Sequence, residues 1–109
     1  MQQISGTDVW RVTEPAIMDT DRYLSSANAP DIEEDARLCI QSGARDMILN
    51  CAPLSYVTGA GLRAFLNIAA LMQRVGGNIA IQGLKGQPLE FFQASGLDSV
   101  IPTLDEDGL

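Results

Sequence analysis

The side chains of this chain with the plainest chemical potential are two thiols and one hydroxyl. Cys39 falls in a helical pattern, Cys51 ends an apolar strand, and Thr58 opens a glycine-rich turn. A cysteine or threonine nucleophile needs a neighbouring base, which is most often histidine, and the chain contains no histidine. A carboxylate or Lys85 would have to serve instead. We therefore expect no enzymatic activity, no cofactor and no metal site.

Both cysteines are interpreted as small hydrophobic residues of a protein core. Free cysteines are among the most buried residue types, and unpaired thiols are usual in a reducing cytoplasm. A redox pair is the alternative interpretation for Cys39 and Cys51. An unusually acidic thiol at Cys51 would also restore it as a candidate nucleophile.

The segment 58–61, Thr-Gly-Ala-Gly, follows a short β-rich stretch and precedes a helical pattern. Such a junction gathers unpaired backbone N–H groups at the start of a helix, which favours anions. Three interpretations are open: a structural turn, a phosphate or nucleotide cradle, and a docking site that is also phosphorylated. Known nucleotide motifs do not support the cradle. Leu62-Arg63 stands where a P-loop needs Lys followed by Ser or Thr, and the dinucleotide fingerprint is absent.

Turn signals and hydrophobic periodicity divide the chain into alternating strands and helices. This alternation predicts one α/β domain with helices packed on a central sheet. Asn28 is the expected N-cap of the first helix, and Gly43 is expected to end it. The predicted order is strand 8–13, strand 16–24, helix 29–42, strand 46–51, helix 60–75, strand 78–84, helix 87–96 and strand 99–102.

The helix predicted over 60–75 has an apolar arc about twice as wide as one sheet requires. Either a neighbouring helix covers the excess, or part of the arc meets a partner. We assign one stripe to the sheet, and truncation of Leu66 within it is therefore expected to destabilise the fold. This stripe comprises Leu62, Phe65, Leu66, Ala69 and Met72, and the adjacent stripe comprises Ala64, Ile68, Leu71 and Val75.

The formal net charge of −7 disfavours nucleic acid and anionic membranes as partners, because both attract clustered Lys and Arg. The middle third of the chain is the exception. Between residues 55 and 97, Glu90 stands against Arg63, Arg74 and Lys85, a balance of +2. This part is the least repulsive surface for an acidic partner. The sequence has no signal-peptide pattern and no apolar run of membrane-spanning length, so we expect a cytoplasmic protein.

Several motifs follow one another in a specific order. An alanine-containing helix precedes Gly43-Ala44-Arg45, which leads into the apolar strand 47–50; the turn segment 54–63, the segment 76–81 and the segment 91–98 follow. Over residues 24–103 this order and spacing resemble the STAS domain of bacterial anti-sigma factor antagonists. The resemblance implies a single domain over 1–109, with a four- to five-stranded mixed sheet and helices packed on one side. Residues 105–109 are expected to be an acidic, frayed tail.

In the STAS family the partner is an anti-sigma factor, often also a Ser/Thr kinase. The kinase phosphorylates a serine in the turn before the second helix, and the added charge breaks the complex. Gly61-Leu62 match the closing Gly-Leu of that turn, which places Gly59 at the acceptor position and Thr58 just before it. Asn50 and Leu24 stand where the family commonly has Asp. The resemblance therefore implies binding without phosphorylation at the usual position, with Thr58 as a poor substitute acceptor.

The turn and the resemblance together predict a regulatory protein–protein interaction module. Its partner would be an anti-sigma factor or a kinase-like regulator, and a homodimer is compatible with the sequence. Small side chains permit close approach of a partner, and Arg63 supplies charge for an acidic one. A STAS subunit of a transporter or of a larger signalling assembly is the alternative. The predicted contact residues are Tyr56, Val57, Thr58, Gly59, Ala60, Gly61 and Arg63.

Overall fold

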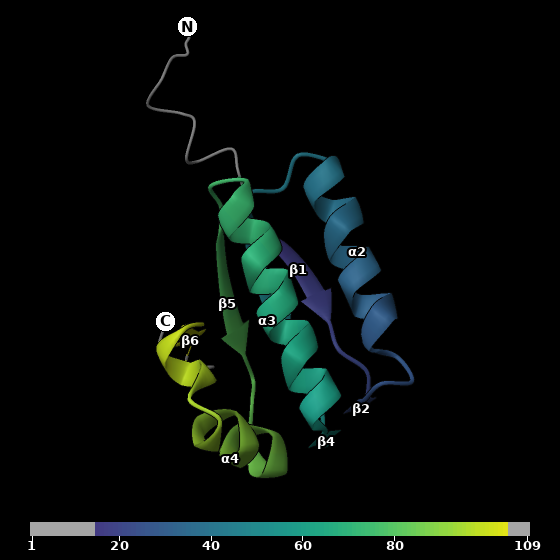
Figure 1. The fold of residues 1–109 in the computed structure, drawn as a ribbon, viewed down its shortest axis with the longest axis vertical. Helices are drawn as coiled ribbons and strands as arrows, with labels where there is room; N and C mark the ends of the chain where they lie inside the picture. Colours follow the sequence, from purple (N-terminus) through teal and green to yellow (C-terminus); the bar gives the residue numbers. More distant parts are fainter. Residues whose placement is uncertain (1–14, 105–109) are drawn as a thin grey trace, which may run out of the picture.

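The computed structural model describes residues 15–104 (Figure 1). The strand predicted over 8–13 and the tail predicted over 105–109 lie outside the described residues. Ten elements follow one another in the described part. They are β1 (Ala16–Asp19), β2 (Tyr23–Leu24), α2 (Ala29–Gln41), β3 (Asp46–Asn50), β4 (Tyr56–Val57), α3 (Gly59–Arg74), β5 (Asn78–Gln82), α4 (Gly86–Ala94), the 3₁₀ turn η2 (Leu97–Ser99) and β6 (Thr103–Leu104).

Four of the strands form one sheet in the order β1-β3-β5-β6, and each described pairing within it is parallel. Met18, Leu49 and Ile81 occupy one row across the first three strands and are all buried. Because side chains alternate along a strand, this row points to the face that the helices cover. The predicted α/β fold with a central sheet is confirmed.

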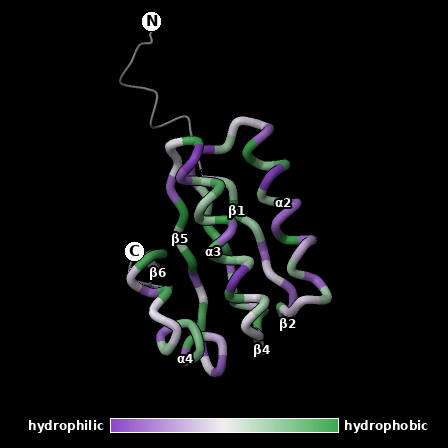
Figure 2. Tube along the Cα trace, viewed as in Figure 1, coloured by the Kyte–Doolittle hydropathy of each residue, from purple (hydrophilic) through white to green (hydrophobic). Residues whose placement is uncertain are grey.

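Helices α2 and α3 lie side by side on that face of the sheet (Figure 1). Ala29, Ile32 and Ala36 form the buried face of α2. Figure 2 shows hydrophobic and hydrophilic residues alternating along α2 and a hydrophobic stretch in β5. Phe65 of α3 meets Phe92 of α4 edge to face, with ring centroids 6.4 Å apart, so α4 joins the same core.

The stripe assignment for α3 was partly wrong. Leu66 is 44% exposed, whereas Phe65, Ile68 and Met72 are fully buried. The buried arc is centred between the two predicted stripes because α3 packs on the sheet and on α2 at once. Leu66 therefore falls at the open margin of the arc, and the expected effect of truncating it is withdrawn.

Two strand predictions also need correction. The strand predicted over 16–24 is two strands, β1 and β2, which pair with different neighbours. The prediction of a strand over 99–102 is wrong. The chain first forms η2, and the strand that pairs with β5 is β6, which comes after it. Pro102 has no N–H to donate to a sheet, although its carbonyl accepts a hydrogen bond from the Ile81 N–H at 2.9 Å.

Candidate functional site

Thr58 is the N-cap of α3 and holds the predicted turn in place. Its hydroxyl accepts a hydrogen bond from the Gly61 N–H at 3.3 Å and donates to the Leu24 carbonyl at 3.5 Å. Its backbone N–H donates to the same carbonyl at 3.0 Å, and its own carbonyl accepts from the Leu62 N–H. Two of the N–H groups at this helix start are therefore already paired, that of Gly61 with the Thr58 hydroxyl and that of Thr58 with the Leu24 carbonyl. This favours the structural interpretation of the hydroxyl.

Gly59 and Gly61 have different surroundings in this turn. A Cβ at Gly61 would lie 2.6 Å from both the Leu24 carbonyl oxygen and Cγ2 of Val57, so only glycine fits. A Cβ at Gly59 would meet nothing within 4 Å. The turn thus packs closely on β2 with one glycine and leaves the other open to a partner.

Two tyrosines extend the surface beside the turn. Strands β2 and β4 pair in parallel, which sets Tyr23 opposite Tyr56, with exposed fractions of 49% and 54%. Their neighbours Leu24 and Val57 are buried. Tyr56 was a predicted contact residue, whereas Tyr23 was missed, because only the pairing of distant segments brings it here. Val57, also predicted, is buried, and its backbone N–H and carbonyl are both bonded to Gln87, so it is not placed to contact a partner.

Two carboxamide side chains bond to the backbone of this strand pair. Asn28 accepts from the Ser25 N–H at 2.9 Å and donates to the Tyr23 carbonyl at 2.8 Å. Gln87 accepts from the Val57 N–H and donates to the Val57 carbonyl, both at 2.9 Å. Asn28 occupies the predicted N-cap position of α2, but its side chain makes no capping bond to the helix.

A groove of about 440 Å³ begins at the turn and runs between α3 and the segment that follows α4. Its lining contains Arg63 and no acidic residue. Of the predicted contact residues, Gly59 and Arg63 line it. Leu66, exposed for the packing reason given above, is a member that the sequence analysis missed. The full lining is Gly59, Leu62, Arg63, Leu66, Asn67, Ser95 and Leu97.

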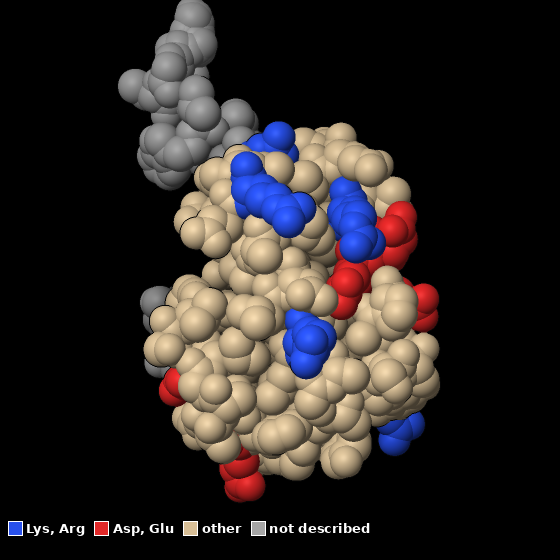
Figure 3. All heavy atoms as spheres, viewed as in Figure 1, with Lys and Arg blue, Asp and Glu red and all other residues tan. Residues whose placement is uncertain are grey.

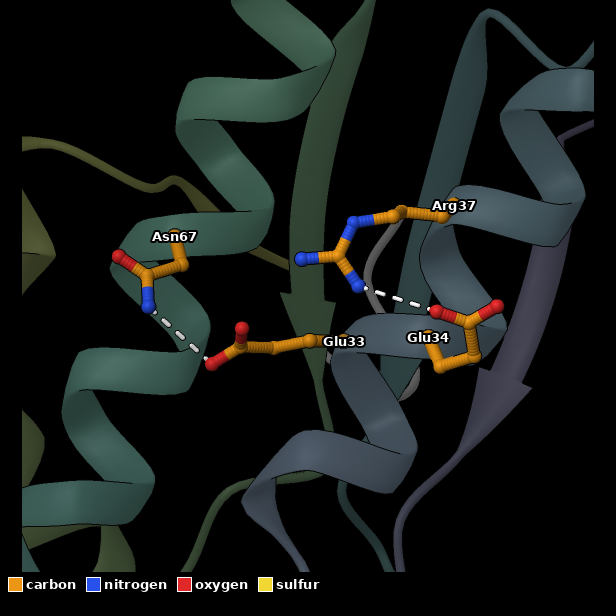
Figure 4. A network of polar contacts seen from close by, with 4 residues as sticks. All are labelled: Glu33, Glu34, Arg37 and Asn67. Carbon is orange, nitrogen blue, oxygen red and sulfur yellow. Dashed lines mark hydrogen bonds and ion pairs between the residues drawn. The ribbon is translucent and has the colours of Figure 1, made fainter.

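The face that carries α2 and α3 is mixed in charge. Helix α3 has two arginines and no acidic residue, and Figure 3 shows basic side chains over this face, with acidic ones gathered toward α2 and the lower end. Asn67 donates to Glu33 at 3.1 Å and Arg37 pairs with Glu34 at 3.1 Å (Figure 4). Two of the α2 acids, Glu33 and Glu34, are thus engaged, and Arg63 is the charged residue of the groove lining.

The geometry gives little support to cysteine chemistry. Cys51 is fully buried, and burial raises the pKa of its thiol to about 12, although a hydrogen bond to Thr20 and the charge of Lys85 act in the opposite direction. A thiol with such a pKa is a weak nucleophile. Cys39 is half-buried against the core. The predicted burial therefore holds fully for Cys51 and partly for Cys39.

An α/β domain that exposes a small-residue turn, a tyrosine pair and a groove has the features of a binding domain. Comparison with known proteins places the chain in a family. Residues 8–107 match the model of the STAS domain, and the chain belongs to that family. Within residues 15–104, no helix is long and apolar enough to cross a membrane.

The chain is also similar to named proteins. The chain is 33% identical over 79 residues to BtrV of Bordetella bronchiseptica, named as an anti-sigma factor antagonist; the match covers 72% of this chain and 68% of BtrV. A crystal structure of an anti-sigma factor antagonist from Thermotoga maritima superposes with a TM-score of 0.76 at 16% identity, covering 84% of this chain and 79% of that one. The murine anion transporter Slc26a9 gives a TM-score of 0.64 at 17% identity, over 76% of this chain and 14% of the transporter.

Proposed function

We propose that this STAS domain is a regulatory interaction module of the anti-sigma factor antagonist type, and that it acts in the cytoplasm. The observation that carries the proposal is the open Gly59, which lines the groove along α3 and follows closely on the strand pair that exposes the two tyrosines. The kinship to BtrV supports the class of partner, an anti-sigma factor or a kinase-like regulator.

The chemistry of the groove suggests what the partner presents. The exposed Leu66 supplies apolar contact, and Arg63 supplies one exposed cation. A partner segment with an aliphatic side chain and a nearby carboxylate would complement both. Such pairing of an apolar anchor with charge gives orientation as well as affinity.

The experiment places a large side chain where the partner should approach. Gly59→Trp is expected to weaken partner binding by at least about tenfold, a change of about 1.4 kcal/mol, while the domain stays folded because the position is open. Ala70→Trp, also exposed on α3 but outside the groove, is the matched control. Tagged protein from the source organism would identify the partner, and calorimetry with the purified partner would give the affinities. Equal affinity of Gly59→Trp and wild type in a folded protein would place the interface elsewhere.

The second candidate is a STAS subunit of a transporter or a larger signalling assembly. The fold similarity to part of the murine transporter and the missing acceptor hydroxyl at Gly59 favour considering it. The identity of the co-purified partner distinguishes the two: a sigma-factor regulator supports the first proposal, and a transport protein supports the second.

A further inference from the structure

The side-chain carboxamide of Gln87 bonds to the outer side of β4 in the way that a neighbouring strand would. Parallel strands pair through alternating N–H donors and carbonyl acceptors. A carboxamide offers one group of each kind, and that of Gln87 bonds both the N–H and the carbonyl of Val57 at 2.9 Å. Both bonds are partly shielded from water, so losing them would leave polar backbone groups of the buried Val57 in need of new partners.

This pair of hydrogen bonds between Gln87 and Val57, called the clamp below, connects the turn to α4. Gln87 stands in the first turn of α4, and Pro88 and Phe92 anchor that helix in the core. Just beyond the other end of α4, Ser95 and Leu97 line the groove together with Gly59. Helix α4 therefore holds β4 at one end and leads into the groove lining at the other.

We propose that Gln87 is a positioning residue for the partner: its carboxamide fixes β4 and the following turn against α4, and thereby sets the partner affinity. Gln87 lies outside the groove lining, so it acts through Val57. The proposal rests on the proposed function for its consequence in binding. The clamp itself can be tested on the domain alone.

Gln87→Glu gives the test a pH signature. A protonated carboxyl group has one O–H donor and one carbonyl acceptor, so it can reproduce the clamp, whereas the ionised group loses the donor and faces the Val57 carbonyl with negative charge. Bonding by the neutral form raises the pKa of this carboxyl above the ordinary value of about 4.3. Both bonds of the clamp should therefore be present at about pH 4, and the bond donated to the Val57 carbonyl should be lost as the pH rises through the raised pKa. Gln87→Met, similar in length but unable to form the clamp, should lack it at every pH.

The first measurement combines amide hydrogen exchange at Val57 with the free energy of unfolding at each pH. Gln87→Met is expected to be about tenfold less protected than wild type at Val57 at every pH, because it cannot accept from the Val57 N–H. Gln87→Glu should stay protected there, because its carboxylate still accepts, but it should lose stability relative to wild type between about pH 4 and about pH 8, because the ionised group no longer donates to the Val57 carbonyl. Unchanged protection in Gln87→Met, or parallel stability profiles of Gln87→Glu and wild type, would overturn the clamp.

The second measurement is affinity for the purified partner, with global stability recorded in parallel. At about pH 8 we expect Gln87→Glu to bind several-fold more weakly than wild type, with recovery as the pH falls toward 4. Loss of Val57 protection with unchanged affinity would overturn the positioning role. If Gly59→Trp also bound like wild type, the proposed interface itself would fail, so the two failures are distinguishable.

Discussion

Gly59 and Gly61 stand two positions apart in one turn, and they are glycine for different reasons. Gly61 is enclosed by the Leu24 carbonyl and Val57, so a side chain there would force the turn away from β2. Gly59 has open space around it and carries no side chain despite that. At the scale of single residues, packing accounts for Gly61, whereas the lack of a side chain at Gly59 suits close approach by a partner.

Thr58 is expected to carry no stoichiometric phosphate. Its hydroxyl is half-buried and bonded to Gly61 and Leu24, and it stands one residue from the acceptor position of the family. Mass spectrometry of protein from the source organism checks this. Thr58→Ala should cost about 1 kcal/mol of stability through loss of the cap. Stoichiometric phosphate on Thr58, together with loss of partner binding in Thr58→Glu, would contradict this prediction.

The two cysteines should differ sharply in reactivity toward an alkylating reagent. The raised pKa of Cys51, about 12, keeps its thiol protonated and inert at pH values well below that. Cys39, which is partly exposed, should be modified first, and Cys51 only after unfolding in urea. Peptide mass mapping with and without urea measures this. Rapid native labelling of Cys51 would instead revive a chemical role for it.

At the scale of elements, α3 connects the core to the candidate site. Its buried arc faces the sheet and α2 together, and its first two turns line the groove. The width of the apolar arc was visible in the sequence, but its direction was not, because direction depends on how α2 packs beside α3. Leu66 changes in this way from a predicted core residue to a residue of the groove.

The revised direction of α3 predicts unequal costs of truncation at adjacent positions. Phe65→Ala should destabilise by about 3–5 kcal/mol, because it removes a fully buried ring that contacts Phe92. Leu66→Ala should cost less than about 1 kcal/mol of stability, yet it should weaken binding of the proposed partner. Urea unfolding of both variants gives the free energies. Similar values would mean that α3 is rotated relative to its described position.

At the scale of the whole molecule, the features predictable from sequence are the local ones. The cores of α2, β3, α3 and β5 were predicted because hydrophobic periodicity and glycine stops act over a few residues. Strand β4 was not, since two residues become a strand only through pairing with Tyr23 and Leu24. The same holds for the Gln87 clamp, whose two partners belong to different elements. The surface of the candidate site is largely made by such distant pairings.

The parallel pairing has a consequence for how the chain folds. Tyr23 pairs with Tyr56 and Asp46 with Asn78, so each of these contacts closes a loop that contains an entire helix. None of the described strands can begin from a tight hairpin, and the entropy of loop closure must be lost before sheet contacts compensate for it. Helices α2 and α3 should therefore gain structure early, and the strand pair that carries the tyrosines should be among the last parts to become protected during refolding.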